Sequence, residues 1–330
     1  MSKHLFGLVV TPCGIAANNR GETEGNITTL HRLLWGGEEY TTVSAEAIRW
    51  GIRWYWQMNE KKINRHWRDN KGSDKKVKEK PSHEWEDREF KNWKEFLDDD
   101  VLGFMDTKGK SGGEKGNAKV RRACLEVTRA ISLIPFAGEV TFNVAGIGAT
   151  LLAGKTGTDP VPYGTEIHAT RYQYGFAMTP DDLHDRNRAL DVVDAIVNLS
   201  SVGGNQSRFL FDFSPDTVIF RWTDDFAPRI LYGFKEDKDT GKIGIPEIVE
   251  RIKAKDIKGS ELFIGGLLSK EIKKEMKESL KDSSVKNAVE EVSFFDGVKE
   301  AADKVNEKIK ASLKDNVVKE VAKAKLFDIE

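Results

Sequence analysis

The apolar run at the start of the chain, residues 5–10, has the length and composition of a buried strand. It reads Leu-Phe-Gly-Leu-Val-Val and ends at Thr11 and Pro12, so it is too short for a helix. The loop that follows, residues 13–22, combines small residues with hydrogen-bonding side chains, namely Asn18, Asn19 and Arg20. Small residues let a backbone approach another molecule closely, while amide and guanidinium groups offer hydrogen bonds. The sequence therefore predicts a strand followed by a loop suited to binding.

A helix is predicted to begin near Ser44, a preferred N-cap residue. At helical spacing its residues form a core face, an aromatic face with Trp50 and Trp54, and a polar face with Glu46, Arg49, Arg53 and Gln57. The positive end of the helix dipole and two arginines one turn apart suit a row of phosphates. The alternative is a solvated polar face with an internal pair between Glu46 and Arg49.

Composition limits the class of protein. The 330 residues, 39% of them hydrophobic, can bury a sizeable core in one elaborated domain or two smaller ones. The net charge of -1 excludes a globally basic nucleic-acid binder, so any attraction to a polyanion must come from local clusters. Cys13 and Cys124 form no CxxC motif, which leaves no disulfide framework and no zinc site. Because neither a membrane span nor a cleavable signal is evident, we expect a soluble, cytoplasmic protein without membrane contact.

Residues 58–116 are predicted to form an insertion into the main fold, because the composition changes after the first helix. Between Lys61 and Lys80 there are nine basic and three acidic residues. Tryptophans lie among and around these charges, at Trp54, Trp56, Trp67, Trp85 and Trp93. Such a mixture can grip a nucleic-acid backbone and stack on its bases. A helical insertion with tryptophans as its own core anchors is equally consistent with this pattern.

An extended hairpin is predicted over residues 140–168. Its glycine-rich tip carries apolar side chains with little polar company, namely Ile147, Leu151 and Leu152. An apolar tip without a core to join suggests contact with another chain or a nucleobase, and a poorly ordered loop is the alternative. The tip also contains Gly154-Lys155-Thr156, which resembles the end of a phosphate-binding loop, but the nearest glycine, Gly148, is one place too early. We therefore expect no nucleotide site, and no cofactor is indicated.

A glycine turn is predicted between a helix and a strand in the second half of the chain. Thr179 and Pro180 are expected to start the helix, whose apolar face extends to Leu199. The turn leads into a predicted strand over residues 209–213 and consists of Gly203, Gly204, Asn205, Gln206 and Arg208. Backbone amides of paired glycines can face a phosphodiester while an arginine neutralises it. The alternative is a helix C-terminal turn that happens to carry polar residues.

The predicted order of elements is strand, helix, insertion, strands, helix and strand. This β-α-β-β-α-β order is typical of the ferredoxin-like or RRM-like fold, of class α+β. Residues 224–330 are expected to be mostly helical, with an apolar stripe from Val298 to Val321 that packs on the body of the same chain. The alternative is a coiled partnership of this stripe with a neighbouring chain.

Five separated blocks between about residue 5 and residue 223 carry a family resemblance. In order they read TPCGIAANNRGETEGN, TVSAEAIRWGIRWY, LEVTRAISLIPF, TEIHATRYQYGFAM and GGNQSRFLFDFSPDTVIFRWT. Together they resemble the backbone subunit of a type I CRISPR Cascade complex, the CRISPR-associated protein seven family, in its DevR (Cst) type I-B form. The match is specific because five blocks agree, whereas any single block would be weak evidence.

The resemblance implies a ferredoxin-like palm with a helical finger insertion and a β-hairpin thumb. The palm is expected to comprise residues 1–57, 117–139 and 169–223. The fingers are expected at residues 58–116, the thumb hairpin at 140–168 and a mostly helical C-terminal part at 224–330.

The resemblance also implies a non-catalytic function. Several copies would line up along one CRISPR RNA together with other Cascade subunits, each palm holding the sugar-phosphate backbone. A thumb would displace a guide base, and the remaining bases would pair with target DNA. The groups implied to contact RNA are Asn18, Asn19, Arg20, Ser44, Arg49, Arg53, Gly203, Gly204, Asn205, Gln206 and Arg208. The groups implied to displace a base are Ile147, Leu151 and Leu152.

A metal-dependent ribonuclease of the same superfamily is the alternative. Related type III backbone subunits cut bound RNA with an aspartate in the loop after the first strand, whereas here Glu22 is the only acid in that loop. The six histidines show no metal-ligand spacing. The sequence therefore indicates no catalytic residue and no metal site.

Overall fold

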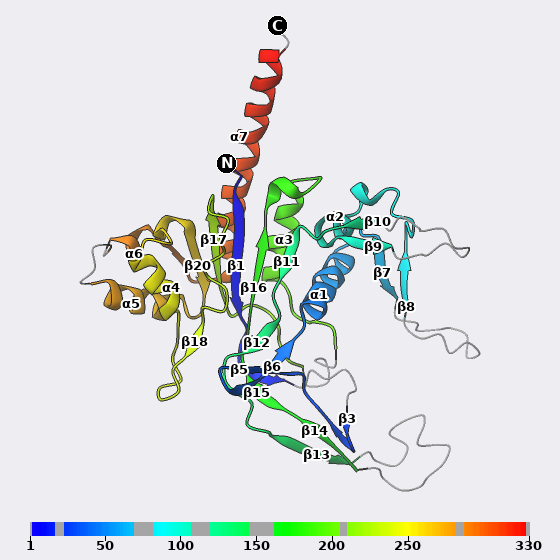
Figure 1. Cartoon of the computed structure of the whole chain (residues 1–330), viewed down its shortest axis with the longest axis vertical. Coiled ribbons are helices and arrows are strands. Elements are labelled where there is room, and N and C mark those ends of the chain that lie inside the picture. The colour runs from blue at the N-terminus through cyan, green and yellow to red at the C-terminus, as the bar shows by residue number, and fades with distance from the viewer. Residues whose placement is uncertain are drawn as a thin grey trace.

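A nine-stranded sheet forms the centre of the described molecule (Figure 1). The computed structural model describes residues 2–327, except 17–22, 69–81, 107–118, 145–161, 205–209, 282–284 and 286. In spatial order the strands are β21 (Ser293–Phe295), β20 (Leu262–Gly266), β17 (Thr217–Thr223), β1 (His4–Val10), β16 (Tyr172–Met178), β12 (Ala130–Ser132), β6 (Glu38–Val43) and β5 (Arg32–Trp35). β11 (Leu125–Val127) also pairs with β16.

Smaller sheets and helices surround this sheet. A four-stranded sheet contains β13 (Val140–Val144), β14 (Pro162–Glu166), β4 (Ile27–Thr28) and β3 (Thr23–Glu24). Paired strands are β2 (Gly14–Ala16) with β15 (His168–Thr170), β7 (Arg65–Arg68) with β8 (Ser82–Trp85), β9 (Phe104–Asp106) with β10 (Lys119–Arg121), and β18 (Lys235–Glu236) with β19 (Ile243–Gly244). The α-helices are α1 (Ala45–Met58), α2 (Leu97–Leu102), α3 (Arg188–Val197), α4 (Pro246–Lys253), α5 (Ser269–Leu280), α6 (Ala288–Glu291) and α7 (Val298–Phe327). Short 3-10 turns are η1 (Trp93–Glu95), η3 (Pro180–Asp182) and η5 (Gly259–Glu261).

β1 is buried along its whole length because helices cover both faces of the sheet. Leu5 and Val9 belong to one hydrophobic cluster, which includes side chains of α1, α3 and α7. Phe6, Leu8 and Val10 belong to a second cluster on the opposite face, with side chains of α4 and α5. Successive side chains of a strand point to opposite faces, so a strand covered on both sides needs a continuous apolar run.

The central strands and the helices α1 and α3 have the predicted ferredoxin-like arrangement. β1 pairs antiparallel with β16 on one edge and with β17 on the other. β11 and β12 extend the sheet beyond β16, also antiparallel. With α1 after β1 and α3 after β16, the chain follows the β-α-β-β-α-β order, and the predicted fold class is confirmed.

Gly7 allows β1 and β16 to pack closely at the centre of the sheet. It lies directly opposite Phe176 in the pairing register. A Cβ atom on Gly7 would lie 2.0 Å from Cε1 of Phe176, so the aromatic ring occupies the space that any larger residue would need. The glycine in the first apolar run is therefore a packing requirement of the strand pair.

The insertion after α1 is attached to the palm through α2. Figure 1 shows it on the side of α1 away from α4 and α5, with strands β7 to β10 around α2. α2 is its one α-helix among the described residues, so strands have a larger share of the insertion than predicted. Part of the basic and tryptophan-rich stretch after α1 forms β7. Residues 69–81 of this stretch lie outside the described residues.

Three consecutive aspartates of α2 are buried, and two of them, Asp98 and Asp100, pair with arginines. Asp98 accepts hydrogen bonds from the backbone amide of Asn64 at 2.6 Å and from Nε of Arg53 at 3.1 Å. Asp100 pairs with Arg121 and, at 2.8 Å, with Nη1 of Arg188. Because an unpaired buried carboxylate is strongly unfavourable, these contacts fix α2 against α1 and α3.

Two local predictions are wrong. Thr179 and Pro180 start the 3-10 turn η3 and not the predicted long helix, since α3 begins only at Arg188. The Thr179 side chain makes no capping hydrogen bond, and its hydroxyl lies 2.8 Å from Nδ1 of His4. The intervening chain is held out of the helix because Asp100 accepts hydrogen bonds from the amides of residues 184 and 185. Residues 210–213 form no strand, since both edges of β1 are already paired and the last palm strand is β17.

α7 packs on the body of the chain at its N-terminal part, as predicted. Val305 and Ile309 are fully buried in the cluster that contains α1 and α3. Figure 1 shows the C-terminal part of α7 extending beyond the sheet. None of the helices in the described residues is both long and apolar enough to cross a membrane.

Candidate nucleic-acid interface

The start of α1 and the second glycine turn lie against each other. Oγ of Ser44 accepts a hydrogen bond from the amide of Ala47 at 3.2 Å, so Ser44 is the predicted N-cap. The amide of Gly203 donates to the carbonyl of Ala47 at 3.0 Å. A Cβ atom on Gly203 would lie only 3.4 Å from Cα of Ala47, so the turn packs directly on the helix. The structure thus brings together Ser44, Gly203 and the exposed Gly204.

The N-terminal end of α1 already has an acidic side chain, Glu46, bonded to its backbone. The pKa of Glu46 is lowered, chiefly because its carboxylate accepts a hydrogen bond from its own backbone amide. Ser44 and Arg129 lower this pKa further. A phosphate at this helix terminus would therefore have to displace or rearrange the exposed Glu46 side chain.

Arg49 and Arg53 are half-buried and point toward α2 rather than standing free in solvent. Arg49 donates to the carbonyl oxygen of Leu102, and Nε of Arg53 donates to Asp98. Burial, and then the nearby charge of Arg53, lower the pKa of Arg49. A guanidinium has five N–H donors, so each arginine keeps donors for a further acceptor, although both have a structural role.

The two predicted binding loops start from neighbouring points. Gly14 of β2 precedes residues 17–22, and Phe211 follows residues 205–209. A Cβ atom on Gly14 would lie 3.1 Å from Cδ2 of Phe211, so these two anchors are in contact. Six of the predicted groups lie outside the described residues, namely Asn18, Asn19, Arg20, Asn205, Gln206 and Arg208.

The predicted hairpin is present as β13 and β14, which pair antiparallel from Val140 to Glu166. Parallel pairing of β14 with β4 attaches it to residues 23–28. At its base, Glu166 accepts a hydrogen bond from the amide of Leu30 at 2.7 Å. The predicted base-displacing groups, Ile147, Leu151 and Leu152, lie outside the described residues.

An apolar strip on this hairpin was missed in the sequence. Val140, Phe142 and Val144 of the edge strand β13 are exposed, Phe142 by 75%. The signal was available, because alternation of three apolar residues with polar ones places all three on one face of a strand. This face of the hairpin is therefore a candidate contact surface.

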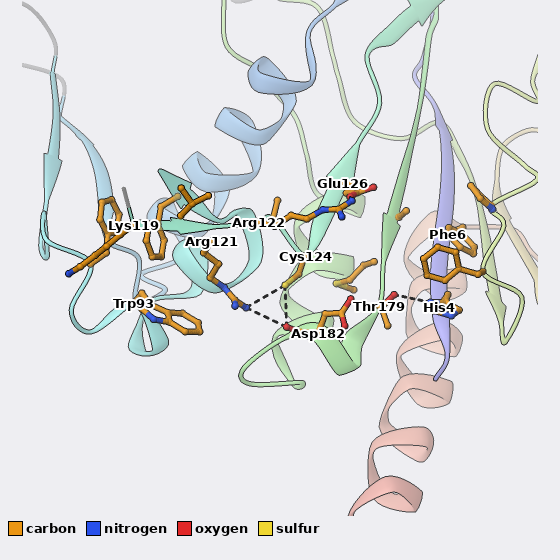
Figure 2. Close-up of a pocket in the computed structure, with 18 of the residues that line it drawn as sticks. His4, Phe6, Trp93, Lys119, Arg121, Arg122, Cys124, Glu126, Thr179 and Asp182 are labelled. Atoms are coloured by element: carbon orange, nitrogen blue, oxygen red, sulfur yellow. Dashed lines mark hydrogen bonds and ion pairs between the residues drawn. The ribbon is translucent and has the colours of Figure 1, made fainter. Parts of the chain in front are cut away.

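A large open cavity lies elsewhere, between the start of β1 and the insertion (Figure 2). It has a volume of about 1210 Å³, and none of the predicted binding residues lines it. Figure 2 shows Arg121 beside Trp93, with its guanidinium carbon 4.2 Å from the ring centre. Sγ of Cys124 donates to the carbonyl of Asp182 at 3.3 Å, and burial raises the pKa of this thiol.

The described residues contain no group of three or more His, Cys, Asp and Glu side chains placed to hold a metal ion. His168 is buried and lies 2.8 Å from the hydroxyl of Thr41 through its Nδ1. Burial lowers the pKa of His168 to about 4, so the ring is neutral at physiological pH. Glu22, the acid considered for a ribonuclease, lies outside the described residues.

Comparison with known proteins adds a family and a fold. The family model described as CRISPR-associated negative auto-regulator DevR/Csa2 matches residues 14–257. A protein of Myxococcus xanthus (strain DK1622) described as CRISPR-associated protein Cas7/Cst2/DevR is 48% identical over 274 residues, which are 81% of this chain and 87% of that protein. A chain of a solved CRISPR RNA-guided surveillance complex, in a pre-nicking state, shares the fold with a TM-score of 0.54 and 12% identity, over 93% of this chain and 100% of that chain.

Proposed function

Because the chain belongs to the DevR family of CRISPR-associated proteins, we propose that it is a non-catalytic subunit that binds CRISPR RNA. In this proposal several copies assemble along one RNA within a type I-B Cascade-like complex in the cytoplasm. The observation that carries the proposal is the contact between the N-terminal end of α1 and the turn at Gly203, two elements whose residues suit a sugar-phosphate chain.

The proposed RNA path runs along this contact. Glycines without side chains let the RNA backbone come close to the protein backbone, and residues 17–22 and 205–209 supply amide and guanidinium donors. Such contacts are indifferent to base identity, so sequence recognition falls to pairing between the guide and target DNA. The hairpin of β13 and β14 supplies the wedge that displaces a base and a contact to the next copy.

Purification of the full-length chain with its bound nucleic acid tests this proposal. We expect RNA of uniform length, recognised by absorbance at 260 nm and nuclease sensitivity, and helical assemblies in electron micrographs. The RNA should remain intact when Mg²⁺ or Mn²⁺ is added. Protein free of RNA would contradict the proposal. Metal-dependent degradation that Glu22→Gln abolishes would instead favour the ribonuclease.

A further inference from the structure

Three tryptophans gather on the outer side of α1, where β7 packs beside it. The rings of Trp50 and Trp54 are nearly parallel, with centroids 5.7 Å apart and an interplanar angle of 6°. Trp67 of β7 meets Trp50 edge-on at 6.0 Å. These three rings, the tryptophan stack, are half-buried, whereas Trp56 of the same helix is fully buried in the core. Trp56 therefore belongs to the hydrophobic core, whereas Trp50 and Trp54 of the same helix are partly accessible to solvent.

The tryptophan stack is held in place before any ligand arrives. Nε2 of Gln57 donates to the carbonyl of Trp67 at 2.7 Å, and Oε1 of Gln57 accepts from the amide of Trp67 at 2.8 Å. This pair of hydrogen bonds fixes β7 to the last turn of α1. A preorganised aromatic surface loses little conformational entropy when a ligand binds, which favours affinity.

Two guanidinium groups line the same small hollow as the indoles. Arg53 and Arg65 lie there with Trp50, Trp54 and Trp67. Burial lowers the pKa of Arg65, and the charge of Arg53 lowers it further, while Asp98 opposes this effect. Among the described residues, the buried Nε of Arg65 has no hydrogen-bond acceptor. The hollow has a volume of about 10 Å³, which is room for a water-sized group and not for a base. A base would therefore stack on the outer faces of the indoles, where the charge of Arg65, together with that of Arg53 beside Asp98, attracts the adjoining phosphate.

The tryptophan stack begins where the RNA path ends. A Cβ atom on Gly203 would lie 3.7 Å from Cβ of Trp50, so the glycine turn lies beside the residue that carries the first ring. We propose that the tryptophan stack binds a base of the RNA strand, with the adjoining phosphate facing Arg53 and Arg65. This inference rests on the proposed function, since the RNA backbone at the Gly203 turn delivers the base. Every base has a π-face, so the stack needs no particular sequence.

Binding of two oligomers of equal length tests the proposal with the full-length chain, freed of bound RNA. One oligomer is oligoadenylate RNA and the other is an abasic ribose-phosphate chain. Trp54→Ala should weaken binding of oligoadenylate roughly 5- to 100-fold, the range for loss of one base stacked on an aromatic ring. Binding of the abasic chain should not change. Trp54→Phe should retain most of the affinity, and Trp35→Ala, at an exposed tryptophan of β5, should bind as the wild type does.

A measurement on the unmodified chain covers the case in which Trp54→Ala fails to fold. Oligoadenylate should quench tryptophan fluorescence, and the abasic chain should not. The proposal is overturned if Trp54→Ala binds oligoadenylate normally, if it loses equal affinity for both oligomers, or if neither oligomer changes the fluorescence. Tight binding of both oligomers by the wild type with equal affinity would overturn only the stacking site. Binding of neither would overturn the proposed function as well.

Discussion

Asp98, Asp99 and Asp100 follow one another in α2 but lie in different electrostatic surroundings. Asp98 and Asp100 each have an arginine partner. Asp99 is equally buried, yet its direct hydrogen bond comes from Nδ2 of Asn64 at 2.8 Å. Burial, and then the negative charge of Asp98, raise the pKa of Asp99 to about 7. The protonation state of one side chain at the junction of palm and insertion therefore changes near neutral pH.

Asp99 should make stability depend on pH. Its folded pKa of about 7 lies above the unfolded value of about 3.9, so the folded state binds the proton more tightly. The stabilisation from this group is fully present below the unfolded pKa and is lost as the pH rises through about 7. Asp99→Asn keeps a hydrogen-bond acceptor for Asn64 but removes the titration. Urea unfolding at several pH values should show the wild type losing up to about 4 kcal/mol relative to this variant as the pH rises.

The control for this prediction is Asp239→Asn, at an exposed aspartate far from α2 in the sequence. It should leave the pH dependence of the wild type unchanged. Parallel pH profiles for the wild type and Asp99→Asn would contradict the assignment of the titration to Asp99.

At the scale of elements, α1 contacts three neighbouring parts of the fold. Its apolar face packs on the sheet, its first turns contact the Gly203 turn, and its arginines contact α2. The spacing of Arg49 and Arg53 was interpreted as a phosphate-binding pair, and the RNA contact of both residues stays a prediction. The structure adds that Arg53 compensates a buried charge, so its substitution affects the fold as well as any bound RNA.

Charge reversal at Arg53 should destabilise the protein. Arg53→Glu replaces the cation beside Asp98 with a second carboxylate, and breaking a buried ion pair costs about 3 kcal/mol or more. Arg53 is 16% exposed and Asp98 is 1% exposed, so solvent screens this pair little. Arg122→Glu is the matched control, because Arg122 is 86% exposed in its pair with Glu126 and should change stability by less than about 1 kcal/mol. Equal free energies of unfolding for the two variants, measured in urea, would refute the structural role of Arg53.

At the scale of the whole molecule, the palm was predictable and the attachment of the insertion was not. The apolar run of β1, the N-cap at Ser44 and the strand β13 are local signals, and the structure has all of them. The partners of Arg53 and Gln57 were not local, because Asp98 and Trp67 come from the insertion and no spacing rule links them to α1. Three acids in a row also suggest a solvated face, whereas α2 buries them. Pairing of β4 with β14 of the hairpin was missed for the same reason.

The central claim is that RNA lies along the contact between α1 and the Gly203 turn. Photo-cross-linking of RNA bound to the purified full-length chain, followed by mass spectrometry of the linked peptides, tests it most directly. We predict cross-links in residues 13–22 and 203–211 and in the N-terminal half of α1. Cross-links confined to the cavity of Figure 2, or to the helices on the opposite face of the sheet, would contradict the account.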